Sequence, residues 1–276
     1  MIVLTTNPTY RVLLLGANGQ LGFLLSNALQ ALGEVKALKR SEADLSNTYA
    51  LRETLLPIIQ KFQPHVIVNA AAYTAVDKAQ TEQTIALQIN AQSVGILAEL
   101  AQSMNAVLVH YSTDYVFDGT GDKPWVEDDP TNPLSVYGQS KWLGECAVRQ
   151  YCQRHLILRT SWVAGAHGEN FAKTMLRLAT QKDVLRVVAD QWGSPTSAAF
   201  LADVTAHVVR QAAAPDFPYG LYHVAGKGKT SWHAYAFHVI ERARQHRWPI
   251  RVTPDLILPI TTAEFPTRSN RPKNTY

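Results

Sequence analysis

The chain has 276 residues, of which 46% are hydrophobic, enough to bury the core of one large domain or of one and a half. Its 6 Trp, 11 Tyr and 14 Pro exclude a disordered or low-complexity chain. The formal net charge of +4 is modest and no basic tract is present, so the sequence indicates phosphate-bearing small molecules rather than nucleic acid as ligands.

The cysteines and the first residues bear on the compartment. Cys146 and Cys152 are too few for a disulfide framework or a zinc site, and the nine histidines show no metal-binding spacing. The apolar run 1–4 lacks the charged and long apolar regions of a signal peptide, and no 18-residue apolar segment follows. We therefore expect a soluble cytoplasmic protein with reduced thiols and without a metal or a membrane partner.

The first 163 residues alternate short apolar runs with longer amphipathic ones, which is typical of repeated βα units. Because the apolar runs are hydrophobic on both faces, they predict a parallel sheet between two layers of helices. The expected strands are 11–16, 34–40, 65–72, 106–112 and 155–163, and the expected helices are 20–33, 48–62 and 81–105.

The regular alternation fades after about residue 162. Helices are expected at 170–181, 198–214 and 232–244, with strand-like runs at 184–190 and 220–226. The predicted fold class is α/β, a doubly wound Rossmann-type parallel sheet with a smaller interleaved C-terminal substrate domain. The expected division is 1–164 with 197–229 for dinucleotide binding, and 165–196 with 230–276 for the substrate.

A glycine loop follows the first predicted strand and opens the first helix. Gly16, Gly19 and Gly22 are spaced G-x-x-G-x-x-G, one residue wider at the front than the common dinucleotide fingerprint. Glycines at a strand-to-helix turn let the backbone approach a pyrophosphate, whose charge then faces free N–H groups at the helix N-terminus. A plain glycine turn is the alternative, and the context favours a phosphate loop.

Tyr137 and Lys141 lie four residues apart in "PLSVYGQSKWLGE", which begins like a helix, so both side chains would share one helix face. An adjacent ammonium shifts a phenol towards the phenolate and makes it a plausible general acid. Taken alone, the pair is equally consistent with an aromatic ring stacked on a lysine stem.

The glycine loop together with the tyrosine–lysine pair resembles the extended short-chain dehydrogenase/reductases. The stretches "VIVNAAAYTAVDKAQ", "VHYSTDYVFDGTG", "NFAKTMLRLA", "DQWGSPT" and "RPKN" are similar to the dTDP-4-dehydrorhamnose reductase family, and the similarity runs from residue 11 to 276. This resemblance implies transfer of hydride from NADPH to C4 of a 4-keto-6-deoxy sugar on thymidine diphosphate. The implied partner is thus a small nucleotide sugar, and a homodimer is left open.

The resemblance also assigns site residues. Thr113, Tyr137 and Lys141 are the implied catalytic residues: Thr113 bonds the substrate carbonyl, Tyr137 protonates its oxygen, and Lys141 tunes the phenol and holds the ribose. The expected cofactor contacts are Gly16, Asn18, Gly19, Gln20, Leu21, Gly22, Lys39, Arg40, Asp44, Leu45, Ala70, Ala71, Ala72, Tyr73, Asn90, Tyr137 and Lys141. The expected substrate contacts are Thr113, Asp114, Tyr115, Trp162, Asn170, Gln191, Pro195, Thr196 and Arg271.

Several of these residues have structural alternatives. Thr113 could satisfy backbone groups at a strand end, the three alanines could serve sheet–helix packing, and Trp162 could be a core aromatic. Asn90 is disfavoured inside a helix, so it is either part of a proton relay, as the resemblance implies, or a solvent-facing polar residue.

Cofactor choice is predicted from the end of the second strand. An acid about 20 residues beyond the glycine loop favours NAD, whereas arginine accommodates the 2′-phosphate of NADP. The strand is expected to finish at Lys39 or Arg40, with Glu42 as the competing acid and Asp44 as a contact to the adenine. NADPH is therefore expected, and NADH is the alternative.

The sequence departs from the family pattern at two places, and rival functions share the fold. Family members usually continue for some tens of residues after "RPKN", so a terminal helix is expected to be absent, and Ala164 stands where the family often has tyrosine. Tyr115 stands where related dehydratases have an acid, which disfavours dehydration. An epimerase with retained NAD and a non-catalytic regulatory subunit of the same fold are the alternatives.

Overall fold

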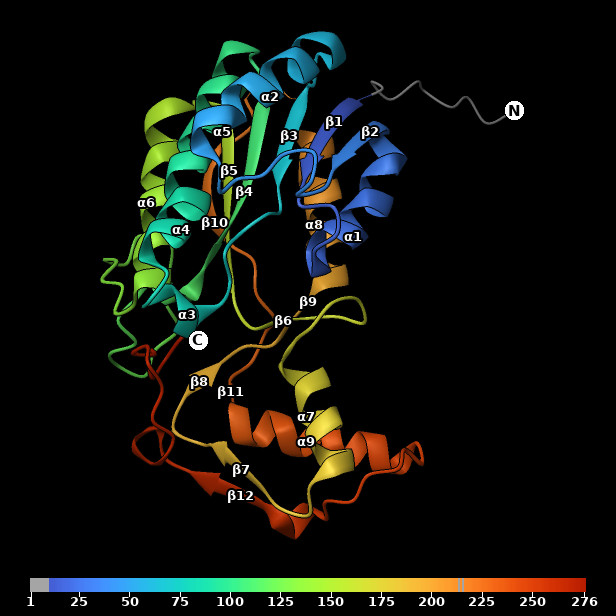
Figure 1. The fold of residues 1–276 in the computed structure, drawn as a ribbon, viewed down its shortest axis with the longest axis vertical. Helices are drawn as coiled ribbons and strands as arrows, with labels where there is room; N and C mark the ends of the chain where they lie inside the picture. Colours follow the sequence, from blue (N-terminus) through green and yellow to red (C-terminus); the bar gives the residue numbers. More distant parts are fainter. Residues whose placement is uncertain (1–9, 213, 215) are drawn as a thin grey trace.

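The computed structural model describes residues 10–212, 214 and 216–276, which form a large lobe with a central sheet and a smaller lobe below it in Figure 1. The prediction that the first residues form no signal peptide falls on residues 1–9 and lies outside the described residues. None of the helices in the described ranges is long and apolar enough to cross a membrane.

The large lobe is built on a six-stranded sheet in which all neighbouring strands are parallel. This confirms the predicted doubly wound sheet. In spatial order the strands are β10 (Gly220–His223), β5 (His155–Thr160), β4 (Val107–Thr113), β3 (Val66–Asn69), β1 (Tyr10–Leu15) and β2 (Gly33–Leu38). The chain adds β2 on one side of β1 and β3 to β10 on the other side, so the strand order reverses between β1 and β3.

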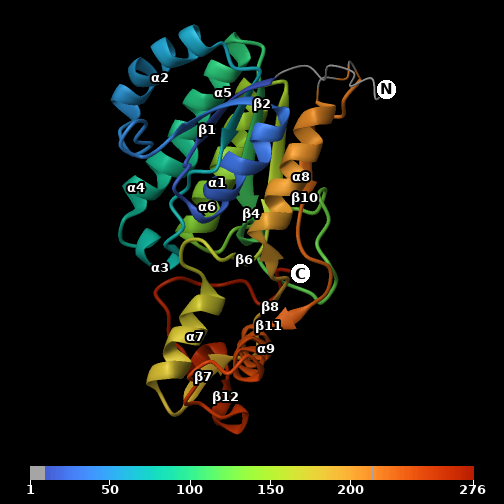
Figure 2. The ribbon, with the colours of Figure 1, turned by 90° about the vertical axis from the view of Figure 1, so that its right-hand side faces the viewer.

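Helices cover both faces of this sheet, as Figures 1 and 2 show. One face carries α2 (Thr48–Phe62), α4 (Gln83–Leu87), α5 (Ser93–Ser103) and α6 (Val136–Tyr151), and the short α3 (Val76–Ala79) lies near its lower edge. The other face carries α1 (Gln20–Ala28) and α8 (Ala198–Gln211).

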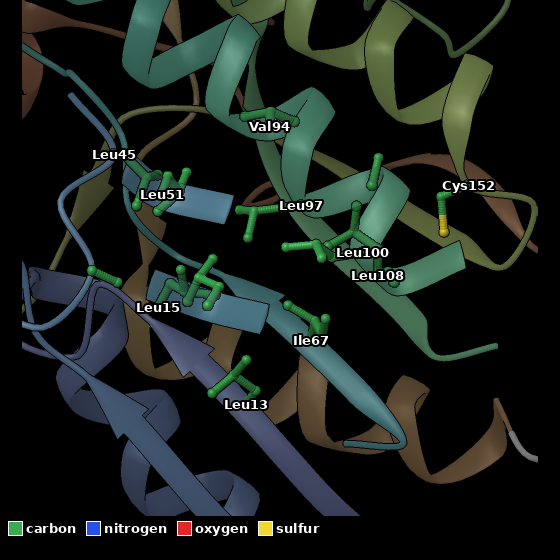
Figure 3. Packing of buried hydrophobic residues seen from close by; sticks show 14 of the residues in the cluster. Leu13, Leu15, Leu45, Leu51, Ile67, Val94, Leu97, Leu100, Leu108 and Cys152 are labelled. Atoms are coloured by element: carbon green, nitrogen blue, oxygen red, sulfur yellow. The ribbon is translucent and has the colours of Figure 1, made fainter. Parts of the chain in front are cut away.

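The alternation of side chains along β1 explains why its sequence is apolar throughout. Leu13 and Leu15 pack into the cluster under α2 and α5, whereas Val12 and Leu14 pack into the cluster under α1 and α8, and all four are fully buried. Figure 3 shows the first cluster, with Leu97 and Leu100 of α5 meeting the strands. The two clusters fix the sheet between its helices and hold the strand ends in place.

The smaller lobe has its own apolar cluster, in which Met175 and Ala179 of α7 (Phe171–Gln181) meet Ala236 and Ile240 of α9 (Trp232–Gln245). The other elements of this lobe are β7 (Leu185–Val188), β8 (Trp192–Gly193), β11 (Thr230–Ser231) and β12 (Ile257–Ile260), and the short strands β6 (Val163–Ala164) and β9 (Thr196–Ser197) lie between the two lobes in Figure 1. β7 pairs with β12, β8 with β11 and β6 with β9. The predicted domain boundaries stay a prediction.

Two of the differences from the sequence-based expectation bear on the site. The helix expected at 81–105 is interrupted by a π-helical segment at Gln88–Gln92 between α4 and α5, a feature that often marks functional sites. β2 ends at Leu38, before Lys39, because the Lys39 N–H turns away from the sheet to the Glu42 carboxylate at 2.9 Å.

Candidate active site

A cavity of about 690 Å³ lies at the carboxyl ends of the central strands, beside the point where strand order reverses. The predicted site residues that line it are Gly16, Asn18, Gly19, Gln20, Leu21, Arg40, Asp44, Leu45, Ala70, Ala71, Ala72, Thr113, Asp114, Tyr137, Lys141 and Trp162. We call this cavity the cleft. The cleft thus brings together three features that are far apart in the sequence: the glycine loop, the end of the second strand and the tyrosine–lysine pair.

The glycine loop has the geometry of a phosphate cradle. Gly16 has φ +80°, and a Cβ there would stand 2.7 Å from Ala71 N, while a Cβ on Gly22 would stand 2.1 Å from Gly16 O. Only glycine fits either position. Gly19 is the N-cap of α1 and, among the described residues, no side chain caps that helix, so its first N–H groups are available to an anion. The loop therefore fits a dinucleotide pyrophosphate.

The end of β2 presents a cation to the cleft. Arg40 lines the cleft and lies 3.4 Å from the Asp44 carboxylate. Burial alone would raise the pKa of Asp44. Hydrogen bonds from Ser46 and the charge of Arg40 nevertheless hold this pKa below its usual value. The competing acid, Glu42, accepts the Lys39 N–H and so is tied to its own turn.

Thr113, Asp114 and Tyr137 form a connected polar group. Thr113 Oγ1 donates to Asp114 Oδ1 at 2.9 Å, and Ser161 Oγ donates to Asp114 Oδ2 at 2.8 Å. Burial raises the pKa of Tyr137 to about 12, an effect that a hydrogen bond with Thr113 partly offsets. Tyr137 therefore keeps its proton at neutral pH, as a general acid must. The expected shift towards the phenolate by Lys141 is not found, because burial of the hydroxyl outweighs it.

The start of α6 positions Tyr137. The helix is capped by Ser135 Oγ, which accepts the Gly138 N–H at 3.0 Å. A Cβ on Gly138 would stand 2.2 Å from Tyr115 O, so this glycine lets the helix start close to the turn after β4. Tyr115 packs edge-on against Tyr137, with ring centroids 5.7 Å apart.

Lys141 lies one helical turn beyond Tyr137 and is 2% exposed. Its Nζ donates to Tyr111 O at 2.6 Å and lies 3.3 Å from His110 Nε2. Burial lowers the pKa of Lys141 to about 8, and the nearby Glu145 charge opposes that shift. A lysine with this pKa can gain or lose a proton near neutral pH.

Asn90 lies in the π-helical segment, and its side chain holds the backbone of Tyr73 rather than reaching the cleft. Its Oδ1 accepts the Tyr73 N–H at 2.8 Å, and its Nδ2 donates to Tyr73 O and to Ser140 Oγ, both at 3.0 Å. The Tyr73 hydroxyl donates to Glu82 at 2.6 Å. Asn90, Tyr73 and Lys39 are not among the cleft-lining residues of the described ranges.

Two buried hydroxyls of the cleft lie outside the set predicted from the sequence. Ser112 Oγ and Thr160 Oγ1 are buried and have no hydrogen-bond partner in the described part of the chain. Buried hydroxyls normally have partners, so these two fit a polar ligand in the cleft. Their place at the carboxyl ends of β4 and β5, next to Thr113 and in register with it, was the available signal. The other missed lining residues are Ala43, Thr74, Ile89, Tyr111, Val163, Gly168 and Glu169.

A second cavity of about 260 Å³ opens in the smaller lobe and is lined by Gln191 and Arg271 with Arg186, Phe265 and Trp232. Trp162 links the two cavities. It lines the cleft and stacks on Trp232, with ring centroids 3.4 Å apart and planes at 8°.

Three predicted substrate residues have other neighbours. Asn170 caps α7 through Lys173 N and donates to Gln20 Oε1 at 2.7 Å. Thr196 is 1% exposed, and its Oγ1 accepts the Gly226 N–H. Pro195 lies against Gly226, since a Cβ on that glycine would stand 2.4 Å from Pro195 O.

Known proteins resemble this chain over nearly its whole length. Residues 10–276 match the family described as RmlD substrate binding domain. The chain is 46% identical over 263 residues to the dTDP-4-dehydrorhamnose reductase of Shigella flexneri, covering 95% of this chain and 87% of that protein. It is 47% identical over 267 residues to the dTDP-4-dehydrorhamnose reductase of Salmonella typhimurium, with the same coverage.

Solved structures agree with these relatives. The dTDP-4-dehydrorhamnose reductase of Bacillus anthracis in complex with NADP matches with a TM-score of 0.86 at 35% identity, covering 97% of this chain and 89% of that one. The UDP-glucose 4-epimerase of Thermus thermophilus in complex with NAD has a TM-score of 0.73 at 17% identity, covering 96% of each chain, and shares the fold alone.

Proposed function

The chain belongs to the dTDP-4-dehydrorhamnose reductase family, and on this premise we infer that it reduces the C4 keto group of dTDP-4-dehydro-L-rhamnose with NADPH to give dTDP-L-rhamnose. The observation that carries this function is the meeting of Thr113, Tyr137 and Lys141 in the cleft that holds the glycine loop. Oxidation of NADPH that depends on the added keto sugar nucleotide tests it.

The proposed chemistry divides between three side chains. NADPH, when bound, supplies the hydride that reaches C4. Thr113 hydrogen-bonds the carbonyl oxygen, and Tyr137 gives that oxygen its hydroxyl proton. The Lys141 ammonium stabilises the phenolate that Tyr137 leaves behind. The hydrogen bond between Thr113 and Tyr137 supports this assignment, because the two hydroxyls are then close enough to reach one substrate oxygen once Thr113 turns its proton from Asp114 to that oxygen.

The second cavity is the proposed site of the nucleotide part of the substrate. Arg186 and Arg271 bring positive charge to it, Phe265 and Trp232 bring apolar area, and Gln191 brings an amide. Arg271 is held by a two-fold hydrogen bond to Asp77, at 2.7 and 3.2 Å, so its guanidinium is fixed in place. The arginine cations suit the diphosphate of the nucleotide, and the aromatic rings suit its thymine base.

NADPH is expected to lose its advantage over NADH in Arg40→Asp. Arg40 is the cation at the end of β2 that lines the cleft, and a charge-assisted hydrogen bond to the 2′-phosphate is worth about 10- to 100-fold in binding. The ratio of kcat/KM for the two cofactors should fall by that factor. Lys36→Asp, an equal charge change at an exposed site on β2, is the control. An unchanged ratio in Arg40→Asp would contradict this role.

Reduction is expected to slow as the pH rises through about 8. Burial lowers the pKa of Lys141 to about 8, so the ammonium is present below that pH and is lost above it, while Tyr137 keeps its proton. The pH profile of kcat/KM, which reports groups of the free enzyme, should therefore fall on its alkaline side, and we call this fall the basic limb. Lys141→Arg, whose charge persists, should lack the limb at this pH. A wild-type profile that stays flat to about pH 10 would exclude Lys141 as the group responsible.

A cytoplasmic location and a homodimer complete the proposal. The free thiols of Cys146 and Cys152 agree with a reducing compartment. The homodimer stays a prediction, which light scattering of the purified protein would decide.

A further inference from the structure

A buried histidine lies directly behind the catalytic lysine. His110 is on β4 and is 0% exposed, and Asn69, on the neighbouring strand β3, is 1% exposed. The His110 ring lies between Asn69 Nδ2, 3.2 Å from its Nδ1, and Lys141 Nζ, 3.3 Å from its Nε2. This imidazole has no role in the proposed mechanism, although a buried titratable ring in contact with a catalytic amine affects the protonation of that amine.

A backbone group determines which ring nitrogen carries the proton. The Ala71 N–H is an obligatory donor and donates to Asn69 Oδ1 at 3.1 Å. The Asn69 amide is thereby oriented, and its Nδ2 presents a proton to His110 Nδ1, which must accept it. The proton of the neutral ring is then on Nε2, and this N–H points at Lys141 Nζ.

The surroundings of Lys141 Nζ match a neutral amine better than an ammonium. One of its protons goes to Tyr111 O at 2.6 Å, which is an obligatory acceptor. A neutral amine has a lone pair for the His110 Nε2–H, and its second proton remains for the cleft. An ammonium has no lone pair and would face that N–H. We propose that His110 is a positioning residue that, oriented by Asn69, favours the neutral form of Lys141.

The charged groups around the pair leave His110 neutral. Burial and the neighbouring Lys141 charge hold the pKa of His110 well below its usual value. Glu145 of α6 is the group whose charge acts on Lys141, and it is engaged by Arg159 of β5 through two hydrogen bonds, at 2.7 and 2.9 Å. Tyr137, on the cleft side, keeps its proton. No carboxylate among the described residues contacts the His110 ring to draw a second proton onto it.

The consequence for catalysis rests on the proposed function. After Tyr137 has protonated the substrate oxygen, it is a phenolate and needs a proton back. A lysine whose neutral form is stabilised gives up its proton more readily, from ammonium to amine, as the phenolate becomes a phenol. One hydrogen bond that favours the amine raises the acid dissociation constant of Lys141 a few-fold to about tenfold.

The tautomer can be read without cofactor or substrate. Long-range ¹H–¹⁵N spectra of protein labelled at histidine distinguish an Nε2–H ring from an Nδ1–H ring and from an imidazolium, and His110→Gln identifies the signal by its loss. We expect the Nε2–H pattern at every pH at which the protein is folded. An Nδ1–H pattern, or titration near the usual histidine pKa, would overturn the proposal whether or not the enzyme has the proposed activity.

Variants test the effect on Lys141. His110→Leu removes the N–H, so the basic limb of kcat/KM should move up by about half a unit to one unit. In His110→Gln, Oε1 can accept from Asn69 and Nε2 can donate to Lys141, so the limb should stay near its wild-type position. Thr205→Val removes the hydroxyl that pairs with Tyr111 at 2.6 Å on the opposite face of β4, and controls for general damage to that strand.

The outcomes separate a structural role from the proposed one. A limb that moves in His110→Leu and stays in His110→Gln and Thr205→Val supports the proposal. A limb that stays in His110→Leu, or moves equally in Thr205→Val, contradicts it. If His110→Leu does not fold, the wild-type tautomer decides. A wild type without reductase activity would instead contradict the proposed function and leave the tautomer result standing.

Discussion

Replacement of Tyr137 by phenylalanine is expected to lower turnover by about 10²–10⁴-fold, the range for loss of a positioned general acid. In the proposed mechanism the phenol is the proton donor to the substrate oxygen. Burial holds its pKa at about 12, so it carries its proton throughout the neutral range. Phenylalanine keeps the ring and its edge-on contact with Tyr115. The loss should therefore appear in kcat and leave stability almost unchanged.

Two measurements accompany this variant. Cofactor affinity, from fluorescence titration with NADPH, should barely change, since the glycine loop and Arg40 are untouched. Turnover near that of the wild type would remove Tyr137 from the mechanism and leave it a packing residue. Loss of cofactor binding in parallel with turnover would show that the hydroxyl acts by holding the cofactor rather than by protonating the substrate oxygen.

Glu145→Ala is expected to lower the free energy of unfolding by about 3–5 kcal/mol, the cost of leaving one partner of a buried ion pair uncompensated. The Glu145 side chain is 0% exposed and that of Arg159 is 3% exposed, with their atoms 2.7 Å apart. Without the carboxylate, the Arg159 guanidinium would remain inside the protein, under α6 and over the Phe117 ring. Equilibrium unfolding in urea measures the loss.

A surface ion pair of the same residue types provides the control. Arg52 and Glu99 join α2 to α5, and their side chains are 47% and 41% exposed. Glu99→Ala should cost about 1 kcal/mol or less, because solvent screens the pair. Equal losses in Glu145→Ala and Glu99→Ala would show that burial of the Glu145–Arg159 pair has no special effect on stability.

The parts of the site that follow local rules could be predicted from the sequence. The spacing of Gly16, Gly19 and Gly22 after an apolar run specifies a strand, a tight turn and a helix, and the structure has all three. Tyr137 and Lys141 are four residues apart on one helix. Their meeting in one cleft follows from the parallel sheet, whose carboxyl ends lie at one edge.

Contacts between distant segments carried no comparable signal. The pairing of Arg271 with Asp77 joins residues 194 positions apart, and the stacking of Trp162 on Trp232 depends on how the smaller lobe folds back. Trp162 has φ +44°, which a sequence pattern does not predict for a tryptophan. The role of His110 was equally hidden, because it depends on an amide of β3 and an amine of α6.

Transfer of deuterium tests the central claim most directly. The enzyme would be given dTDP-4-dehydro-L-rhamnose and NADPH that carries deuterium at the transferable position of the nicotinamide, and the product examined by NMR and mass spectrometry. A reductase places one deuterium on C4 of dTDP-L-rhamnose for each NADPH oxidised. An altered sugar without deuterium at C4, formed while the nicotinamide cofactor stays bound and unconsumed, would contradict reduction and indicate an epimerase.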